Sequence, residues 1–380
     1  MLLAGCGALA VATAAGTADA TVFIKGGSLV VSSTTYQDIG AVAGLIAGSS
    51  LLPGANAGQS VTATAGGGYA SVFNNAGVDG SFGVTSAITI QDLNATSGKV
   101  NGTVNIDPSI VSTSFSSKSE LSLNIAQTKA GPVVTFMGYA GGGVGKLDVS
   151  NSDTTAYKDT TNPVTSFFAP GASQTYAFNR SVVALGANGS YSATQTLAYG
   201  GNNGRAAVLA PNGQYYTVGN SNNGSGTPSQ LTTSTGLEVV TPGATRNSKM
   251  IDPTYQLSFN GKADKAGKDS NFRGLTLYNG NLYFTKGSGS NGVDTVYTVS
   301  NPNGALPTAA TAGAAKVSIL SGFPTDSAKA TGGNYTPFGL FFANNTTLYV
   351  ADEGTGNALD ASTHAGLEKW SEAAGVWHLD

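Results

Sequence analysis

Apolar residues in the second half of the chain gather in short runs that come in pairs around an Asn-containing corner. The clearest copies span residues 272–284 and 337–350, and a weaker copy spans residues 204–218. In each copy an apolar run is followed by Asn-Gly or Asn-Asn and then by a second apolar run. Asn and Gly tolerate the positive φ angles that tight hairpins require. The pattern therefore predicts three β-hairpins.

These hairpins recur at a nearly constant distance along the chain. Tyr216, Tyr283 and Tyr349 hold the same place in the second apolar run and lie 67 and then 66 residues apart. Further apolar runs follow the two clearest hairpins, at residues 295–299, 366–370 and 376–379. A fixed period of four-stranded antiparallel units is typical of a β-propeller. We therefore expect an all-β chain, with a propeller of six or seven four-stranded blades over residues 21–380.

The first half of the chain carries weaker strand patterns that lack this signature. Three apolar runs in the same order predict one earlier blade, at residues 120–125, 132–137 and 146–150. Four short runs could supply another, at residues 21–24, 28–31, 82–85 and 87–90. Residues 49–80 are rich in Gly, Ala and Ser and predict an irregular excursion. Because no closing strand follows residue 379, we expect the ring not to close within this chain, which would then be a fragment or be completed by other residues.

The composition excludes one class of function. Charged residues make up 10% of the 380 residues and the formal net charge is −3, so the electrostatic footprint of a nucleic-acid-binding protein is missing. Hydrophobic residues reach 40%, which is enough to fill cores between blades. After the first residues, no segment reaches the ~18–20 uninterrupted apolar residues that a membrane span needs.

The N-terminus predicts export. Residues 1–20 form a small apolar stretch that ends in Ala18-Asp19-Ala20, which matches the cleavage rule of a signal peptide. The alternative is a lipobox ending at Cys6, which would become a lipidated first residue. Both interpretations place the protein outside the cytoplasm, either secreted or periplasmic. Cys6 is the only cysteine, so no intramolecular disulfide is expected.

Two arginines precede strands at equivalent places of the repeat. Asn203-Gly204-Arg205 and Asn271-Phe272-Arg273 are 68 residues apart, which is close to the hairpin period. If these strands line the channel of a propeller, the two guanidinium groups could bind an anion there. The alternative is that each arginine pairs with a carboxylate or carbonyl group of the neighbouring blade.

Carboxylates next to predicted strands are candidate calcium ligands, since calcium prefers oxygen donors. Asp352 and Glu353 follow the strand of the last repeat, and Asp148 and Asp153 flank the end of an earlier predicted strand. The alternative is a solvated turn in which the Asp side chain accepts backbone N–H groups.

The phrase Leu282-Tyr283-Phe284-Thr285, and above all the phrase Thr-Leu-Tyr-Val-Ala-Asp at residues 347–352, resembles the repeat of gluconolactonase-like and NHL-type propellers. The resemblance covers the three hairpin repeats and implies a propeller fold. For the lactonases it also implies a calcium ion held in the channel by Glu, Asn and Asp. The matching positions are Asn203, Asn271, Asn334 and Glu120, and an unambiguous metal carboxylate is missing from the last three repeats.

Three functions follow as hypotheses. The first is an exported cell-envelope or extracellular binding scaffold that holds a small molecule, a glycan or a protein at the channel mouth or loops. The second is a calcium-dependent lactonase or esterase-like hydrolase with its site at the channel. The third is a structural surface-layer-like protein that assembles through exposed strand edges. No catalytic constellation is complete in the sequence.

Overall fold

We analysed a computed structural model of the whole chain. It describes residues 24, 27–36, 49–53, 60–62, 65–66, 69–73, 83–115, 121–146, 149–152, 178–221, 234–243, 248–255, 269–301, 303–328, 335–354 and 365–380. The predicted signal peptide, Cys6, Glu120, Asp148, Asp153 and Asn334 lie outside these residues.

The described chain is all-β, and its first half forms one eight-stranded antiparallel sheet. The order is β1-β6-β8-β10-β11-β12, with β7 added beside β6 and β9 added beside β10. The strands are β1 (Ser28–Thr35), β6 (Val84–Asn94), β7 (Val100–Ile106), β8 (Val111–Phe115), β9 (Asn124–Thr128), β10 (Gly131–Ala140), β11 (Arg180–Gly186) and β12 (Tyr191–Thr196). We call this the first sheet.

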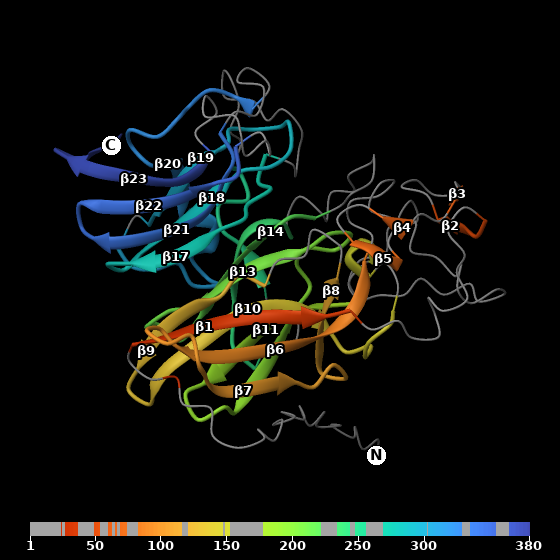
Figure 1. Cartoon of the computed structure of the whole chain (residues 1–380). Helices are drawn as coiled ribbons and strands as arrows, with labels where there is room; N and C mark the ends of the chain where they lie inside the picture. Colours follow the sequence, from red (N-terminus) through yellow and green to blue (C-terminus); the bar gives the residue numbers. More distant parts are fainter. Residues whose placement is uncertain are drawn as a thin grey trace, which may run out of the picture.

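The second half forms three four-stranded sheets in which strands that follow one another in sequence also pair. The second sheet holds β13 (Gly204–Leu209), β14 (Tyr215–Gly219), β15 (Gly236–Val240) and β16 (Ser248–Met250). The third holds β17 (Leu275–Tyr278), β18 (Asn281–Lys286), β19 (Thr295–Ser300) and β20 (Lys316–Ile319). The fourth holds β21 (Pro337–Asn344), β22 (Thr347–Asp352), β23 (Gly366–Ala373) and β24 (Val376–Leu379). Figure 1 shows the third and fourth sheets together in cyan and blue, with β13 and β14 between them and the first sheet.

The predicted hairpins are confirmed as β13–β14, β17–β18 and β21–β22. The corner between β17 and β18 is Asn279-Gly280, with φ of 48° and 75°. Positive φ at both central residues is the geometry that matches the twist of two antiparallel strands, which is why this dipeptide predicts the turn well.

The sheets stack face to face, and apolar cores fill the spaces between them. Met137 and Val182 of the first sheet pack with Ala207 and Tyr215 of the second. A larger core joins the second and third sheets, and another joins Val296 of the third sheet to the fourth. Within the first sheet, residues of β6 and β7 pack against residues of β10 and β11, so that this sheet folds over itself. Each sheet from the second onward therefore rests on its predecessor.

Several predicted strands of the first half need correction. In the described part of residues 146–150 the predicted strand is absent, since Lys146 lies in no strand and Val149–Asn151 is a 3-10 turn. Four glycines with positive φ between residues 141 and 145 precede it. The strand that follows β10 in the sheet is instead β11, far along the chain, while β8 and β9 also pair with β10. Residues 84–85 and 87–90 are not two strands but parts of β6, residue 82 lies outside the described part, and the strand predicted at residues 120–125 begins only at Asn124. Ile24 is not in a strand, and residues 21–23 lie outside the described part.

The predicted excursion at residues 49–80 contains two short two-stranded ladders. β2 (Leu51–Pro53) pairs with β3 (Ser60–Thr62), and β4 (Ala65–Gly66) pairs with β5 (Tyr69–Phe73). Among the described residues, no helix has the length and apolar character needed to cross a membrane.

Candidate functional site

The predicted site residues gather where the first strand of a sheet starts and the second ends. Asn203 precedes β13, Asn271 and Arg273 precede β17, and Asp352 closes β22. Lys286, which the sequence did not predict as a site residue, closes β18 in the same way. In an antiparallel pair the start of one strand lies beside the end of its neighbour. Polar side chains from these places therefore share one end of the sheets, and most of them are buried.

Arg205 reaches from the second sheet to the third. Its Nη1 donates hydrogen bonds to Asn271 Oδ1 and to the Phe272 carbonyl oxygen, the latter at 3.0 Å. The Asn271 amide in turn donates to Ser288 Oγ at 3.1 Å. Arg205 therefore pairs with a carbonyl group of the neighbouring sheet, which was the alternative to anion binding in the sequence analysis.

Arg273 makes the corresponding contact one sheet further on. Its guanidinium carbon lies 3.9 Å from the centre of the Phe338 ring, which belongs to β21 of the fourth sheet. A cation at this distance from a ring face is attracted by the π-electrons. The two arginines therefore have the same structural role. Each contacts residues at or just before the first strand of the following sheet.

Arg180 is a third arginine of this kind, which the sequence reasoning missed. It is fully buried at the start of β11. Its guanidinium group donates to the carbonyl oxygens of four residues: Ser150, Ser152, Phe178 and Asn202. Asn202 lies two residues before β13, so Arg180 joins the first sheet to the start of the second. Asn179 stands directly before Arg180, whereas one residue separates Asn from Arg in the other two copies, so the local sequence does not place Arg180 with them.

Lys286 and Asp294 form a buried ion pair beside Arg205 and Arg273. Lys286 Nζ lies 2.6 Å from Asp294 Oδ1, and both side chains are almost fully buried. Burial lowers the pKa of Lys286 and raises the pKa of Asp294, and in each case the charge of the partner opposes the shift. Lys286 Nζ also donates to the Ser288 carbonyl oxygen at 3.0 Å. The ion pair therefore joins the two ends of the loop between β18 and β19.

Asp352 uses one carboxylate oxygen to hold a turn. Oδ1 accepts hydrogen bonds from the Thr336 and Gly354 backbone N–H groups, both at 2.8 Å, and from Thr336 Oγ1 at 3.0 Å. Oδ2 is buried and has no hydrogen-bond partner, whereas Glu353 is exposed. Within the described ranges, no three His, Cys, Asp or Glu side chains are placed to share a metal ion. Of the positions that the resemblance implies for calcium, Glu120 and Asn334 lie outside the described residues, and Asn271 Oδ1 accepts a hydrogen bond from Arg205.

The fourth sheet buries a second carboxylate. Trp370 Nε1 donates to Glu368 Oε2 at 2.8 Å. Burial, together with the charges of Glu368 and Asp352, raises the pKa of Tyr335. The tyrosine therefore stays un-ionised.

Glu238 on β15 is fully buried, and burial raises its pKa well above the usual range, although Lys249 opposes the shift. A carboxylic acid whose pKa is higher in the folded than in the unfolded protein stabilises the fold fully below its unfolded pKa. That contribution is lost as the pH rises through the folded pKa.

We expect the free energy of unfolding to fall by up to about 1.4 kcal/mol per pH unit above ~pH 4.5 because of Glu238 alone. Glu238→Gln should remove this slope, and the exposed Glu353→Gln should keep it. Urea unfolding of the three proteins between acid and neutral pH measures the difference. Parallel pH profiles for the parent and Glu238→Gln would contradict the assignment.

Two hollows lie at the opposite, hairpin end of the sheets. The larger, a groove of about 570 Å³, runs beside β9 and is lined by Ile125, Ala126, Gln127, Thr128, Lys129, Val208, Leu209, Ala210, Pro211, Gly213 and Leu277. Its lining is mainly aliphatic, and Lys129 is the titratable side chain in it. The groove suits a largely apolar molecule with a negatively charged end.

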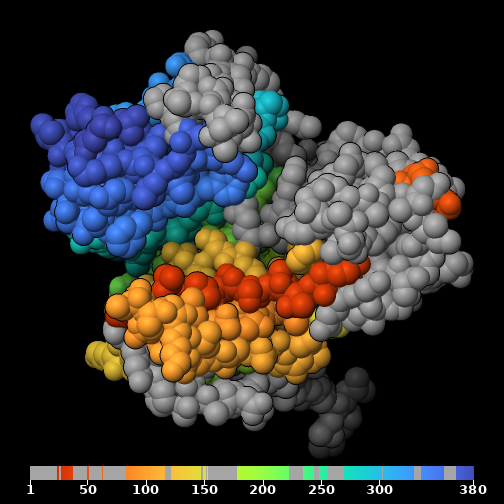
Figure 2. Space-filling view, viewed as in Figure 1, coloured from red at the N-terminus to blue at the C-terminus, as the bar shows by residue number. Residues whose placement is uncertain are grey.

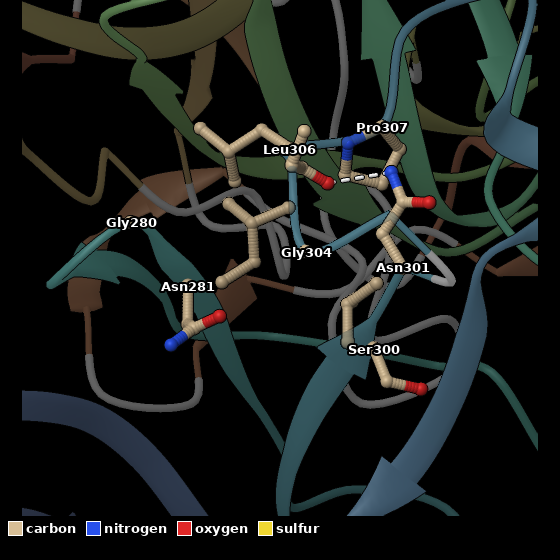
Figure 3. A pocket seen from close by; sticks show the side chains of 10 residues that line it. Gly280, Asn281, Ser300, Asn301, Gly304, Leu306 and Pro307 are labelled. Carbon is tan, nitrogen blue, oxygen red and sulfur yellow. Dashed lines mark hydrogen bonds between the residues drawn. The ribbon is translucent and has the colours of Figure 1, made fainter.

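The smaller hollow, of about 250 Å³, lies between the start of β18 and the loop after β19 (Figure 3). Asn301 Nδ2 donates to the Ala305 carbonyl oxygen at 2.5 Å and folds this loop back, as the dashed line in Figure 3 shows. Leu306 and Pro307 form its apolar wall, and Asn281 and Ser300 supply polar groups. It contains no titratable side chain and offers no acid or base for catalysis.

Comparison with models of known protein families finds no match, and comparison with curated proteins finds none either.

Proposed function

We propose that the chain is an exported β-propeller-type binding scaffold that holds a largely apolar small molecule in the groove beside β9. The observation that carries this proposal is the contrast between the two ends of the sheets. At one end, Arg180, Arg205 and Arg273 contact the next sheet. At the other end, aliphatic side chains of β9, β13 and β17 surround a hollow of about 570 Å³.

The propeller part of the proposal rests on the repeat. Three consecutive four-stranded meanders pack face to face, which is how propeller blades are arranged. In such a ring the first strand of each blade lines the central channel. The groove, which touches β9, β13 and β17, would then form part of that channel, and a ligand there would touch several blades at once.

A fluorescent probe with an apolar ring system and a sulfonate group, 1-anilinonaphthalene-8-sulfonate, tests the groove directly. We expect the folded protein to bind it and Ile125→Asp to weaken binding at the groove by about tenfold or more, because a carboxylate would enter the apolar lining and repel the sulfonate group of the probe. Ile125 is half exposed, so the substitution should leave the fold intact. The matched control is Leu29→Asp, at a similarly exposed apolar position on β1.

Equal binding by the parent and both variants would overturn the groove as the binding site. The same proteins can be unfolded thermally with calcium and with a chelator. A calcium-dependent rise of the midpoint would instead favour the calcium-dependent hydrolase, for which the buried Oδ2 of Asp352 is the available oxygen. The scaffold proposal expects no such rise.

A further inference from the structure

The groove beside β9 has one charged end. Ile125 and Gln127 lie on the same side of β9, because alternate side chains of a strand point the same way, and Lys129 stands in the turn that follows. All three are exposed and line the groove. Over a span of about 13 Å, at ~3.3 Å per residue, the lining changes from aliphatic to neutral polar to cationic. The groove therefore has the polarity that suits an amphipathic ligand with a negative charge at one end.

The turn that holds Lys129 is fixed by Thr128. The Thr128 hydroxyl group donates to the Gly131 carbonyl oxygen at 2.7 Å and accepts a hydrogen bond from the Ala130 backbone N–H at 3.1 Å. The backbone of Lys129 is therefore held at one place of the groove. A long lysine side chain can lay its aliphatic stem along such a lining and keep its ammonium group in water at the mouth.

Two strands that form walls of the groove are joined to each other. Asn124 Nδ2 donates to the Ala207 carbonyl oxygen at 3.0 Å, and Thr135 Oγ1 of β10 donates to the same oxygen at 2.7 Å. From this point β9 continues toward Lys129, and β13 continues as a second wall. The groove is therefore formed before a ligand arrives, which lowers the entropic cost of binding.

The rest of the lining is aliphatic. The first sheet contributes Ile125 and Ala126, β13 contributes Val208 and Leu209, and β17 contributes Leu277. Figure 2 shows the first sheet, in orange and red, below the cyan and blue surface of the third and fourth sheets. None of the eleven residues that line the groove carries an aromatic ring. Since aromatic ligands gain most from packing against other rings, this lining favours an alkyl chain.

The charged end suits a head group with a single negative charge. Lys129 is the titratable side chain of the groove, and no carboxylate of the described residues forms an ion pair with it. Phosphate groups are matched best by the planar fork of an arginine, and Arg180, Arg205 and Arg273 are buried at the opposite end of the sheets. The ammonium group of one lysine acts as a point charge, which matches a carboxylate, and the Gln127 amide offers a second donor.

We propose that the groove binds a linear aliphatic carboxylate, a ligand class that rests on the proposed function of the same groove. The carboxylate lies at Lys129, and the alkyl chain lies along the aliphatic lining. Binding removes apolar surface of both partners from water and gives the ammonium group a counter-ion. A cationic chain would bring two like charges together, and a neutral chain would leave the ammonium group without a counter-ion.

Isothermal titration calorimetry of the full chain at neutral pH and low salt tests this ligand class. The probes are decanoate, decanamide and decylamine, which share one chain length and differ in charge. We expect the parent protein to bind decanoate most tightly and decylamine most weakly. In Lys129→Glu this order should reverse, and the ratio of the decanoate and decylamine affinities should change by about tenfold or more. Added salt should weaken the preference for decanoate, because the pair is exposed.

Two further variants complete the test. Lys129→Gln removes the charge without adding another, so decanoate and decanamide should then bind with similar affinity. Lys99→Glu is the matched control, since Lys99 is an exposed lysine between β6 and β7 that does not line the groove, and it should keep the order of the parent. Unchanged decanamide binding in all variants shows that the groove is intact.

The outcomes separate the ligand class from the groove itself. A parent protein that binds none of the three probes would overturn both the proposed function and the ligand class. Equal binding of decanoate and decanamide by the parent would overturn the ligand class alone and leave the groove as an apolar site. The same holds if Lys129→Glu keeps the order of the parent, or if Lys99→Glu reverses it as well.

Discussion

Arg180→Met should lower the free energy of unfolding by about 3–5 kcal/mol. Arg180 is fully buried, and its guanidinium group satisfies the carbonyl oxygens of four residues in three different segments. Methionine fills much of the same volume but donates no hydrogen bond. The carbonyl oxygens of Ser150, Ser152, Phe178 and Asn202 would then be buried without this donor, and each loss is costly away from water.

Urea unfolding at neutral pH measures the loss, and an unchanged slope with denaturant would show that the unfolded state is unaffected. Lys316→Met is the matched control. Lys316 is 58% exposed and pairs with Asp252 at 3.2 Å, so its replacement should cost only ~0–1 kcal/mol. A similar loss in both variants would mean that Arg180 does not join the first two sheets.

The buried pair of Lys286 and Asp294 gives the second large effect. Lys286→Met should cost about 3–5 kcal/mol, because it leaves the Asp294 carboxylate buried without its cation. The double variant Lys286→Met/Asp294→Leu should recover most of this loss, since replacing both members of a buried pair by apolar groups is often neutral.

The stability of the double variant decides whether the two residues interact. If the loss in the double variant equals the sum of the two single losses, the two residues do not interact, and the short distance between them has no energetic meaning. The raised pKa of Asp294 predicts in addition that the single variant Lys286→Met is less unstable at acid pH, where the carboxyl group is protonated.

The hairpins of the second half were predictable because their signals are local. Asn279-Gly280 supplies two positive φ angles in adjacent residues, and the flanking apolar runs set the register of β17 and β18. The strands of the first sheet were harder to predict, because their pairing is distant. β10 pairs with β11 across residues 141–179, and glycines 141, 142, 143 and 145 turn the chain out of the predicted strand at residues 146–150.

The candidate site was predictable only as a set of residues. The period of the repeat placed Arg205 and Arg273 at equivalent positions, but their partners, Asn271 and the Phe338 ring, depend on how neighbouring sheets stack. Arg180 and Lys286 escaped prediction because a cation in the sequence is most often exposed. Their burial follows from carbonyl oxygens and a carboxylate that only the folded chain brings together.

The second, third and fourth sheets are each built from one continuous stretch of chain, whereas the first needs residues from Ser28 to Thr196. Closing a short loop costs less entropy than closing a long one, and local contacts form sooner. During synthesis, the first sheet must therefore wait for nearly two hundred residues to emerge. Each later sheet can form as it leaves the ribosome and find the face of its predecessor already complete. We therefore expect the N-terminal half to fold more slowly than the three later sheets.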